Sequence, residues 1–206
     1  MIDFNLYLIT DRHQTGGRPL LTVVEEALQA GIKAVQLREK DLSAKELFEL
    51  AQNLRRLTRQ YHARFFINDR VDIAMAVEAD GVHLGQKSFS AKDVKRIFPK
   101  AIIGVSTHSL DEAKKAEAGE ADFITIGPIF YTPSKASYGE PLGVEVIKQV
   151  RKEIHTPVFA IGGIKEDNAR GVIDAGADGI AVISAVMRAE DVEEAVREMY
   201  AAISQK

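Results

Sequence analysis

The chain has 206 residues, of which 46% are hydrophobic and 28% charged, a composition typical of a folded globular protein. Its 27 Lys and Arg residues against 30 Asp and Glu residues give a net charge of −3, which predicts no nucleic-acid and no membrane partner. The sequence has no cysteine, so disulfide bonds, thiolate catalysis and cysteine-bound metals are excluded. No apolar run reaches the ~20 residues of a membrane span, and the N-terminal segment does not resemble a signal peptide. We therefore expect a cytoplasmic protein.

Short apolar segments alternate with amphipathic ones along the chain. Helices are predicted between the apolar segments, and Ser43 with Glu46 forms a capping box that starts one over 43–61. Ser109 with Glu112 starts another in the same way. The apolar segments are rich in Val and Ile, as are strands buried on both faces of a parallel sheet. They cover residues 6–10, 34–37, 64–68, 81–84, 101–105, 122–127, 157–161 and 179–183.

A similar junction between helix and strand recurs four times, as AGIKAVQL (30–37), VEADGVHL (77–84), GEADFITI (119–126) and AGADGIAV (175–182). Such a recurrence indicates a repeated βα unit. Eight units in 206 residues leave about 26 residues each, which favours a compact (β/α)8 TIM barrel with few insertions. A doubly wound open sheet is the competing fold. No linker divides the chain, so we expect a single domain over residues 1–206.

In such a barrel the active site lies at the carboxyl ends of the strands. Gln36, Arg38 and Lys40 alternate at the end of the second strand, so period two aims all three in one direction. Two cations and an amide at this spacing suit a phosphate or pyrophosphate. The alternative is a solvated loop in which Glu39 and Asp41 neutralise the cations.

Other strand ends carry further candidates. Asn68 and Asp69 follow the third strand, where a carboxylate can hold Mg²⁺; alternatively, Asp69 caps the helix that starts near Val71. The glycines at 162–163 and the pair at 183–184 follow the seventh and eighth strands, which form the usual phosphate site of barrels. A simple turn is the alternative there.

The longest connection, 127–143, carries Thr132, Ser134 and Lys135, which are all able to bind phosphate. A surface loop without ligand contacts is the alternative. The histidines have no metal-ligand spacing, and His83, which alternates with apolar neighbours, is predicted to be a packed residue. The sequence shows no Ser-His-Asp arrangement.

Taken together, these motifs resemble the thiamine-phosphate synthase family along the whole chain. The matching words are LYLITD (6–11), VQLREK (35–40), INDRVDIAMAVEADGVHLGQ (67–86), IIGVSTHS (102–109), DFITIGPIFYTPSK (122–135), AIGGI (160–164) and AGADGIAVISAV (175–186). The resemblance implies a (β/α)8 barrel that couples hydroxymethylpyrimidine diphosphate to a thiazole phosphate with release of pyrophosphate, and that needs Mg²⁺.

The resemblance also implies roles for individual residues. Arg38, Lys40 and Lys135 would be catalytic, through their charge on the leaving pyrophosphate. Asp69 would bind Mg²⁺, with Ser88 as a further metal ligand. The implied substrate-binding residues are Gln36, Arg38, Lys40, Asn68, Ser106, Lys135 for the diphosphate and Thr132, Ser134, Gly163, Ile183, Ser184 for the thiazole phosphate.

One departure from the family pattern leaves other functions open. Ser88 stands where the synthases have an acidic metal ligand, and this segment resembles that of the related thiazole tautomerases. The tautomerases, however, carry a catalytic histidine where this chain has Pro128. The alternatives are therefore a tautomerase and a non-catalytic regulator that binds phosphorylated ligands. The predicted partners are small phosphorylated substrates and, as a further option, a second copy of the chain in a homodimer.

Overall fold

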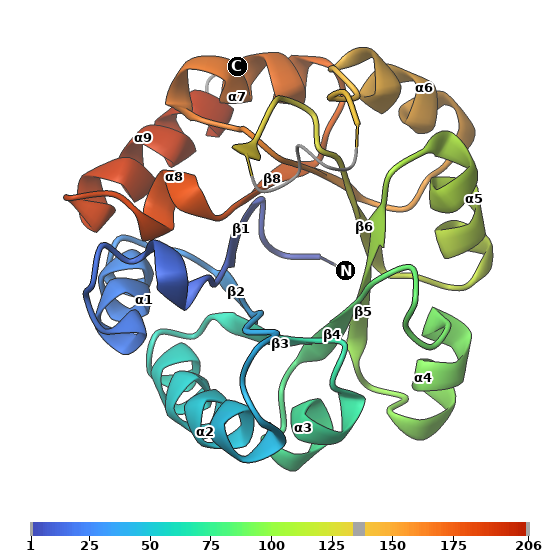
Figure 1. Cartoon of the computed structure of the whole chain (residues 1–206). Coiled ribbons are helices and arrows are strands. Elements are labelled where there is room, and N and C mark those ends of the chain that lie inside the picture. Colours follow the sequence, from blue (N-terminus) through green and yellow to red (C-terminus); the bar gives the residue numbers. More distant parts are fainter. Residues whose placement is uncertain (1, 134–138, 205–206) are drawn as a thin grey trace.

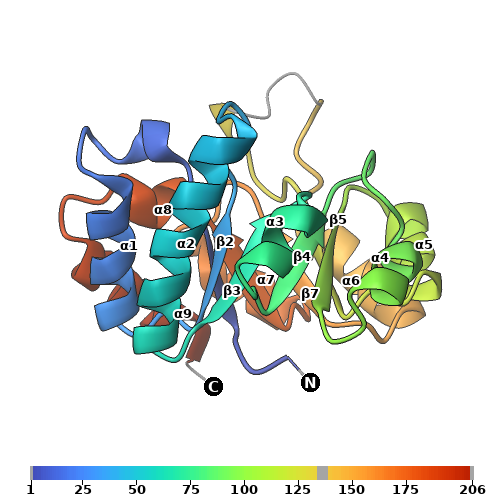
Figure 2. The ribbon, with the colours of Figure 1, turned by 90° about the horizontal axis from the view of Figure 1, so that it is seen from below.

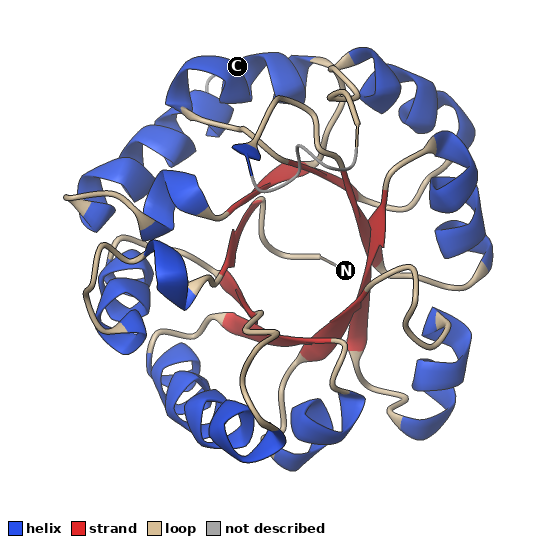
Figure 3. Cartoon of the chain, viewed as in Figure 1, coloured by secondary structure: helices blue, strands red, loops and turns tan. Residues whose placement is uncertain are grey.

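Eight parallel strands close into a barrel in the computed structural model, which describes residues 2–133 and 139–204 (Figures 1 and 3). Each strand pairs with its neighbours in chain order, and β8 pairs with β1 to complete the ring. The (β/α)8 prediction is confirmed and the open sheet is wrong. The strands are β1 (Leu6–Ile9), β2 (Ala34–Leu37), β3 (Arg64–Asn68), β4 (Gly81–Leu84), β5 (Ile102–Thr107), β6 (Phe123–Ile126), β7 (Val158–Ile161) and β8 (Gly179–Val182).

The helices form an outer ring around the strands (Figure 3). They are η1 (Arg12–Gln14), α1 (Leu20–Gln29), α2 (Ala44–Gln60), α3 (Val71–Ala76), α4 (Ala91–Ile97), α5 (Leu110–Ala118), α6 (Glu145–Glu153), α7 (Glu166–Asp174), α8 (Ser184–Met187) and α9 (Val192–Ser204). The capping box at Ser43 forms as predicted. At α5, Ser109 accepts from the Glu112 N–H at 3.2 Å, but the Glu112 carboxylate reaches the His108 N–H instead. No described helix has both the length and the apolar character needed to cross a bilayer.

The four recurring junctions between helix and strand share one turn geometry. In each, a residue with φ between +53° and +107° follows the helix, and the next N–H donates to a carbonyl five residues back, which is a Schellman motif. The positive-φ residues are Gly31, Glu78, Glu120 and Gly176. Three corners also place an aspartate whose carboxylate accepts an N–H of a neighbouring strand, at Asp80, Asp122 and Asp178. The sequence recurs at these junctions because the same hydrogen bonds form at each of them.

Aromatic rings fill the barrel interior toward the amino ends of the strands. Phe4, Tyr7, Phe66, Phe123 and Phe159 pack together with ring centroids 5.2–6.4 Å apart. The N-terminal segment enters the centre of the ring and brings Phe4 into this layer (Figure 1). Both ends of the chain lie away from the loop that follows β6 (Figure 2). The aromatic layer closes one end, so the open mouth lies at the carboxyl ends of the strands.

Candidate active site

Polar side chains form the next layer of the barrel interior, above the aromatic one. Gln36, Asn68 and Thr125 each lie two residues beyond a member of the inner core (Ala34, Phe66 or Phe123), so strand alternation points them inward. His83 and Ser106 belong to the same layer, because the His83 Nε2 lies 3.1 Å from the Ser106 Oγ and 3.3 Å from the Thr125 Oγ1. The prediction that His83 is packed is confirmed, since it is buried.

Three buried polar atoms in the barrel have no hydrogen-bond partner among the described residues. They are the Tyr7 hydroxyl, Gln36 Nε2 and His83 Nδ1. Leaving a buried polar group unpaired typically costs about 1–3 kcal/mol, so such groups call for water or a ligand. The barrel interior therefore offers unused hydrogen-bonding capacity.

The pKa of His83 depends on its burial and on two charges from strand ends. Burial lowers the pKa of His83 from 6.5 to about 3, so its imidazole is neutral. The charge of Asp69 raises this pKa and the charge of Arg38 lowers it. Asp69 and Arg38 come from different strand ends, and both act on the same buried ring.

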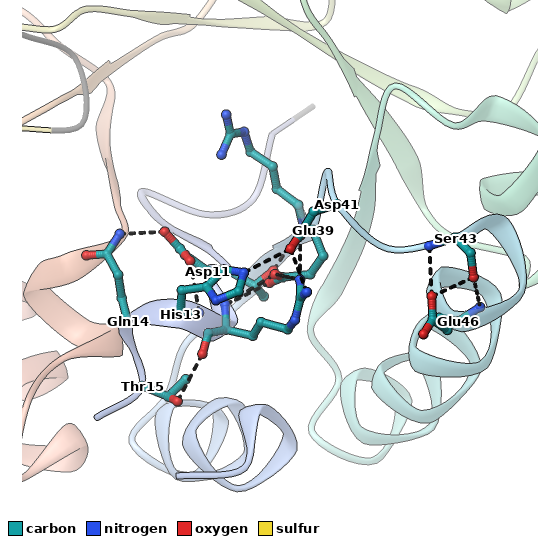
Figure 4. A network of polar contacts seen from close by, with 11 residues as sticks. Asp11, His13, Gln14, Thr15, Glu39, Asp41, Ser43 and Glu46 are labelled. Carbon is teal, nitrogen blue, oxygen red and sulfur yellow. Dashed lines mark hydrogen bonds and ion pairs between the residues drawn. The ribbon is translucent and has the colours of Figure 1, made fainter. Parts of the chain in front are cut away.

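The carboxylates of Glu39 and Asp41, which follow Arg38 and Lys40 in the chain, take part in another network of contacts (Figure 4). Glu39 accepts from Arg12 Nη1 at 3.2 Å, and Asp41 accepts from both terminal nitrogens of Arg12 at 2.6 Å. This pairing raises the pKa of Arg12 and lowers that of Asp41, chiefly through their shared hydrogen bonds. Within the described chain, the side chains of Arg38 and Lys40 have no ion-pair partner. The alternative of a loop neutralised by Glu39 and Asp41 is therefore wrong.

The predicted alternation at 36, 38 and 40 holds only in part. Gln36 is buried in the barrel, Arg38 is half-buried, and Glu39 is buried among partners on the β1 side. However, β2 ends at Leu37, and Lys40 is exposed in a turn, where the strand period no longer sets its direction. The three residues lie in order from the interior outward.

Asp69 is held in a fixed orientation by its neighbours. Its Oδ1 accepts from the Gly85 N–H at 3.0 Å and from the Ser88 hydroxyl, and its Oδ2 accepts from Asn68 Nδ2 at 2.8 Å. Its backbone adopts a φ of +59°, which is uncommon outside glycine. The residue before α3 is Arg70, and no side chain caps that helix. The alternative in which Asp69 caps α3 is therefore wrong.

The oxygen atoms around Asp69 suit a small hard cation. Mg²⁺ prefers oxygen ligands and usually keeps several waters, so it needs few protein groups. Asp69, Asn68 and Ser88 bring a carboxylate, an amide and a hydroxyl together. In the described part of the chain no three acidic or histidine side chains gather as a metal cluster. This set of oxygen donors fits a Mg²⁺ ion that takes its remaining ligands from water and from a bound substrate.

The end of β7 lies against the loop after β6. The N–H groups of Ile129 and Phe130 donate to the carbonyls of Ile161 and Gly162 at 2.9 and 3.0 Å. A side chain at Gly163, where φ is +65°, would come within 2.6 Å of the Tyr131 carbonyl oxygen. Glycine is therefore required there for packing as well as for conformation.

The remaining predicted residues lie near these strand ends or outside the described part. Ile183 precedes α8, and the exposed Ser184 is its first residue. Thr132 is half-buried in the loop after β6. Ser134 and Lys135 lie outside the described residues.

Sequence reasoning did not single out Tyr7, Thr125 or Gln86. Gln86 Nε2 donates to the Ser106 carbonyl, which ties the loop after β4 to the end of β5. The available signal was the strand period, because Thr125 is the polar residue at an inward position of an otherwise apolar strand.

The fold and the site define a (β/α)8-barrel protein with an oriented carboxylate at its open mouth and with cations there that have no ion-pair partner among the described residues. The sequence model of the family described as Thiamine monophosphate synthase matches residues 6–186. A thiamine-phosphate synthase of Moorella thermoacetica is 48% identical over 97% of this chain and 95% of its own length. A protein of Geobacter sulfurreducens is 54% identical over 97% of this chain and 94% of its own length. The chain belongs to the thiamine monophosphate synthase family.

A solved structure agrees with this assignment. The structure described as thiamine phosphate pyrophosphorylase from Pyrococcus furiosus superposes with a TM-score of 0.89 at 45% identity. The match covers 97% of this chain and 95% of that one. Both sequence and fold thus agree over nearly the full length.

Proposed function

We propose that the protein is a thiamine-phosphate synthase, a transferase that couples hydroxymethylpyrimidine diphosphate to a thiazole phosphate and releases pyrophosphate. The observation that carries this proposal is the pair of cations at the mouth, Arg38 and Lys40, whose neighbouring carboxylates are both occupied by Arg12. A diphosphate is the anion that such unpaired cations would bind, through charge-assisted hydrogen bonds. Its relatives carry the same activity in their names.

The arrangement supports a reaction driven by stabilising the leaving group. The bond between the hydroxymethyl carbon and the diphosphate oxygen breaks, and its electron pair leaves with pyrophosphate. Arg38, Lys40 and Lys135 would stabilise the charge that develops on those oxygens. The thiazole nitrogen then supplies an electron pair to the pyrimidine cation, and a C–N bond forms. No proton is removed, so the reaction requires no general base.

The inner polar layer would hold the pyrimidine. Gln36, Asn68 and Ser106 line it, and Gln36 Nε2 and the Tyr7 hydroxyl have no hydrogen-bond partner in the described part of the chain. They offer hydrogen bonds to ring nitrogens and exclude water from the reacting carbon. A neutral His83 adds no charge that would repel the pyrimidine cation.

Mg²⁺ would bind at Asp69, with the Ser88 hydroxyl beside it. When bound, it would offset the negative charge of the pyrophosphate. The thiazole phosphate would lie across the mouth, at Thr132, Ser134, Gly163 and the backbone of 183–184. We further propose that the enzyme works in the cytoplasm on small phosphorylated substrates, and that nucleic acids and membranes are not its partners.

The test is incubation of the purified protein with both substrates and Mg²⁺, with each component omitted in turn. The expected result is thiamine phosphate and pyrophosphate in equal amounts only in the complete mixture. If the thiazole substrate is supplied as a thiazole carboxylate phosphate, its isomerisation without coupling would instead identify a tautomerase. Binding of both substrates without turnover would identify a regulator, and either result would refute the proposal.

A further inference from the structure

Thr10 joins the end of the first strand to the segment that carries Arg38 and Lys40. Thr10 follows β1 and is fully buried. Its hydroxyl accepts from the Arg38 N–H at 3.0 Å and donates to Glu39 Oε1 at 2.7 Å, while its own N–H donates to the Gln36 carbonyl at 2.9 Å. Thr10 therefore holds the backbone of the second strand end at Gln36 and Arg38, and it also holds the side chain of Glu39.

The carboxylate of Glu39 is directed entirely toward the first strand end (Figure 4). Its side chain is 2% exposed and accepts from the Thr10 hydroxyl, from the Arg12 N–H at 3.1 Å, and from Arg12 Nη1 at 3.2 Å. A buried carboxylate needs such partners, because burial without them is strongly unfavourable. These contacts keep the charge of Glu39 away from Arg38, its neighbour in the chain.

We propose that Thr10 and Glu39 are positioning residues for diphosphate binding, an inference that rests on the proposed function. They hold the backbone at Arg38 in place and keep the adjacent carboxylate paired with Arg12. Neither side chain is assigned to the diphosphate, because the Thr10 hydroxyl and the Glu39 carboxylate are already engaged in the contacts described above. Without the Thr10 hydroxyl, the Arg38 N–H loses its acceptor and Glu39 loses a donor, so the segment relaxes and the cations lose their fixed positions.

Thr10→Val tests this, because valine has nearly the same shape and lacks only the hydroxyl. The probe is inorganic pyrophosphate with Mg²⁺, and the measurement is its affinity by calorimetry. We expect the dissociation constant to rise about tenfold, as one lost hydrogen bond to a buried group implies. Thr10→Ser restores the hydroxyl and should recover most of the affinity.

Thr58→Val is the matched control, because Thr58 is also fully buried with a hydrogen-bonded hydroxyl, donated to the Arg55 carbonyl at 3.2 Å within α2. It should lower thermal stability to a similar extent and leave pyrophosphate affinity unchanged. If Thr10→Val does not fold, Glu39→Gln replaces it, because an amide nitrogen would face the donors of Arg12 and weaken the same connection.

Equal affinity of Thr10→Val and the wild type would overturn the inference, as would failure of Thr10→Ser to restore binding. A loss in Thr58→Val as large as in Thr10→Val would also overturn it, since general loosening would then explain the effect. If the wild type bound no pyrophosphate, the proposed function would fail and this inference with it. Wild-type binding that Thr10→Val leaves intact refutes only the role of Thr10 and Glu39.

Discussion

Ser88→Asp places a second carboxylate against Asp69 and tests the geometry of the metal site. In the structure the Ser88 hydroxyl donates to Asp69 Oδ1 and accepts from the Gly85 N–H at 2.8 Å. The substitution removes the donor and sets two negative charges beside each other. Without a divalent cation the variant should therefore be less stable than the wild type.

The size of this effect follows from the exposure of the pair. Two unit charges 4 Å apart interact by about 4 kcal/mol at an effective dielectric constant of 20 and by about 1 kcal/mol in water. Asp69 and Ser88 are both half-buried, which places their interaction between these two limits, at about 1–2 kcal/mol. For a chain of this size, that lowers the melting temperature by about 2–8 °C. Mg²⁺ between the carboxylates should reverse the loss.

The assay is thermal unfolding over a series of Mg²⁺ concentrations, with Ser88→Asn as the uncharged control of similar shape. Mg²⁺ should raise the melting temperature of Ser88→Asp more than that of Ser88→Asn or the wild type. It should also reach half-maximal support of product formation at a lower concentration in Ser88→Asp. The same Mg²⁺ response in Ser88→Asp and Ser88→Asn would refute the placement of position 88 at the metal.

Three further predictions concern the interior, the mouth and the loop after β6. Because burial lowers the pKa of His83 from 6.5 to about 3, the unfolded chain binds more protons in this range, so stability falls as pH drops from 6.5 toward 3. His83→Gln should reduce the slope of that loss by up to about 1.4 kcal/mol per pH unit in denaturant titrations, and unchanged slopes would contradict this. Arg38→Ala should lower kcat/KM at least about 100-fold while Lys45→Ala, an exposed control on α2, should not; near-normal kinetics would disprove the diphosphate role. Gly163→Ala should lower the free energy of unfolding by about 1–3 kcal/mol, as measured by chemical denaturation. Gly171→Ala, in α7, should raise it, because a side chain there would contact no other atom. Equal effects of the two substitutions would count against the packing argument.

The barrel was predictable because its local rules are repeated. Each buried strand has an apolar run. The junctions at Gly31, Glu78, Glu120 and Gly176 share one hydrogen-bond pattern, and this pattern is visible in the sequence as a recurring motif. Strand ends were less predictable. Thr10 was expected within the first strand but lies beyond β1, and β5 extends to Thr107, because pairing with neighbours decides where a strand ends.

The site was predictable as a set of strand ends and not as a network. The sequence places Arg38 and Asp69 at the mouth, and their charges do act on one buried ring. The sequence cannot show which cation pairs with Glu39 and Asp41, because Arg12 lies far from them in the chain, before α1 and β2. Equally, the contact of Ser88 with Asp69 depends on how the loop after β4 folds back.

The central claim, that the barrel mouth binds the diphosphate, is tested most directly by a crystal structure of the protein with Mn²⁺ and inorganic pyrophosphate. The account predicts pyrophosphate in contact with Arg38 and Lys40, and an anomalous Mn²⁺ peak beside Asp69 that also touches the anion. Pyrophosphate bound away from the carboxyl ends of the strands, or Mn²⁺ held at a site that excludes Asp69, would contradict it.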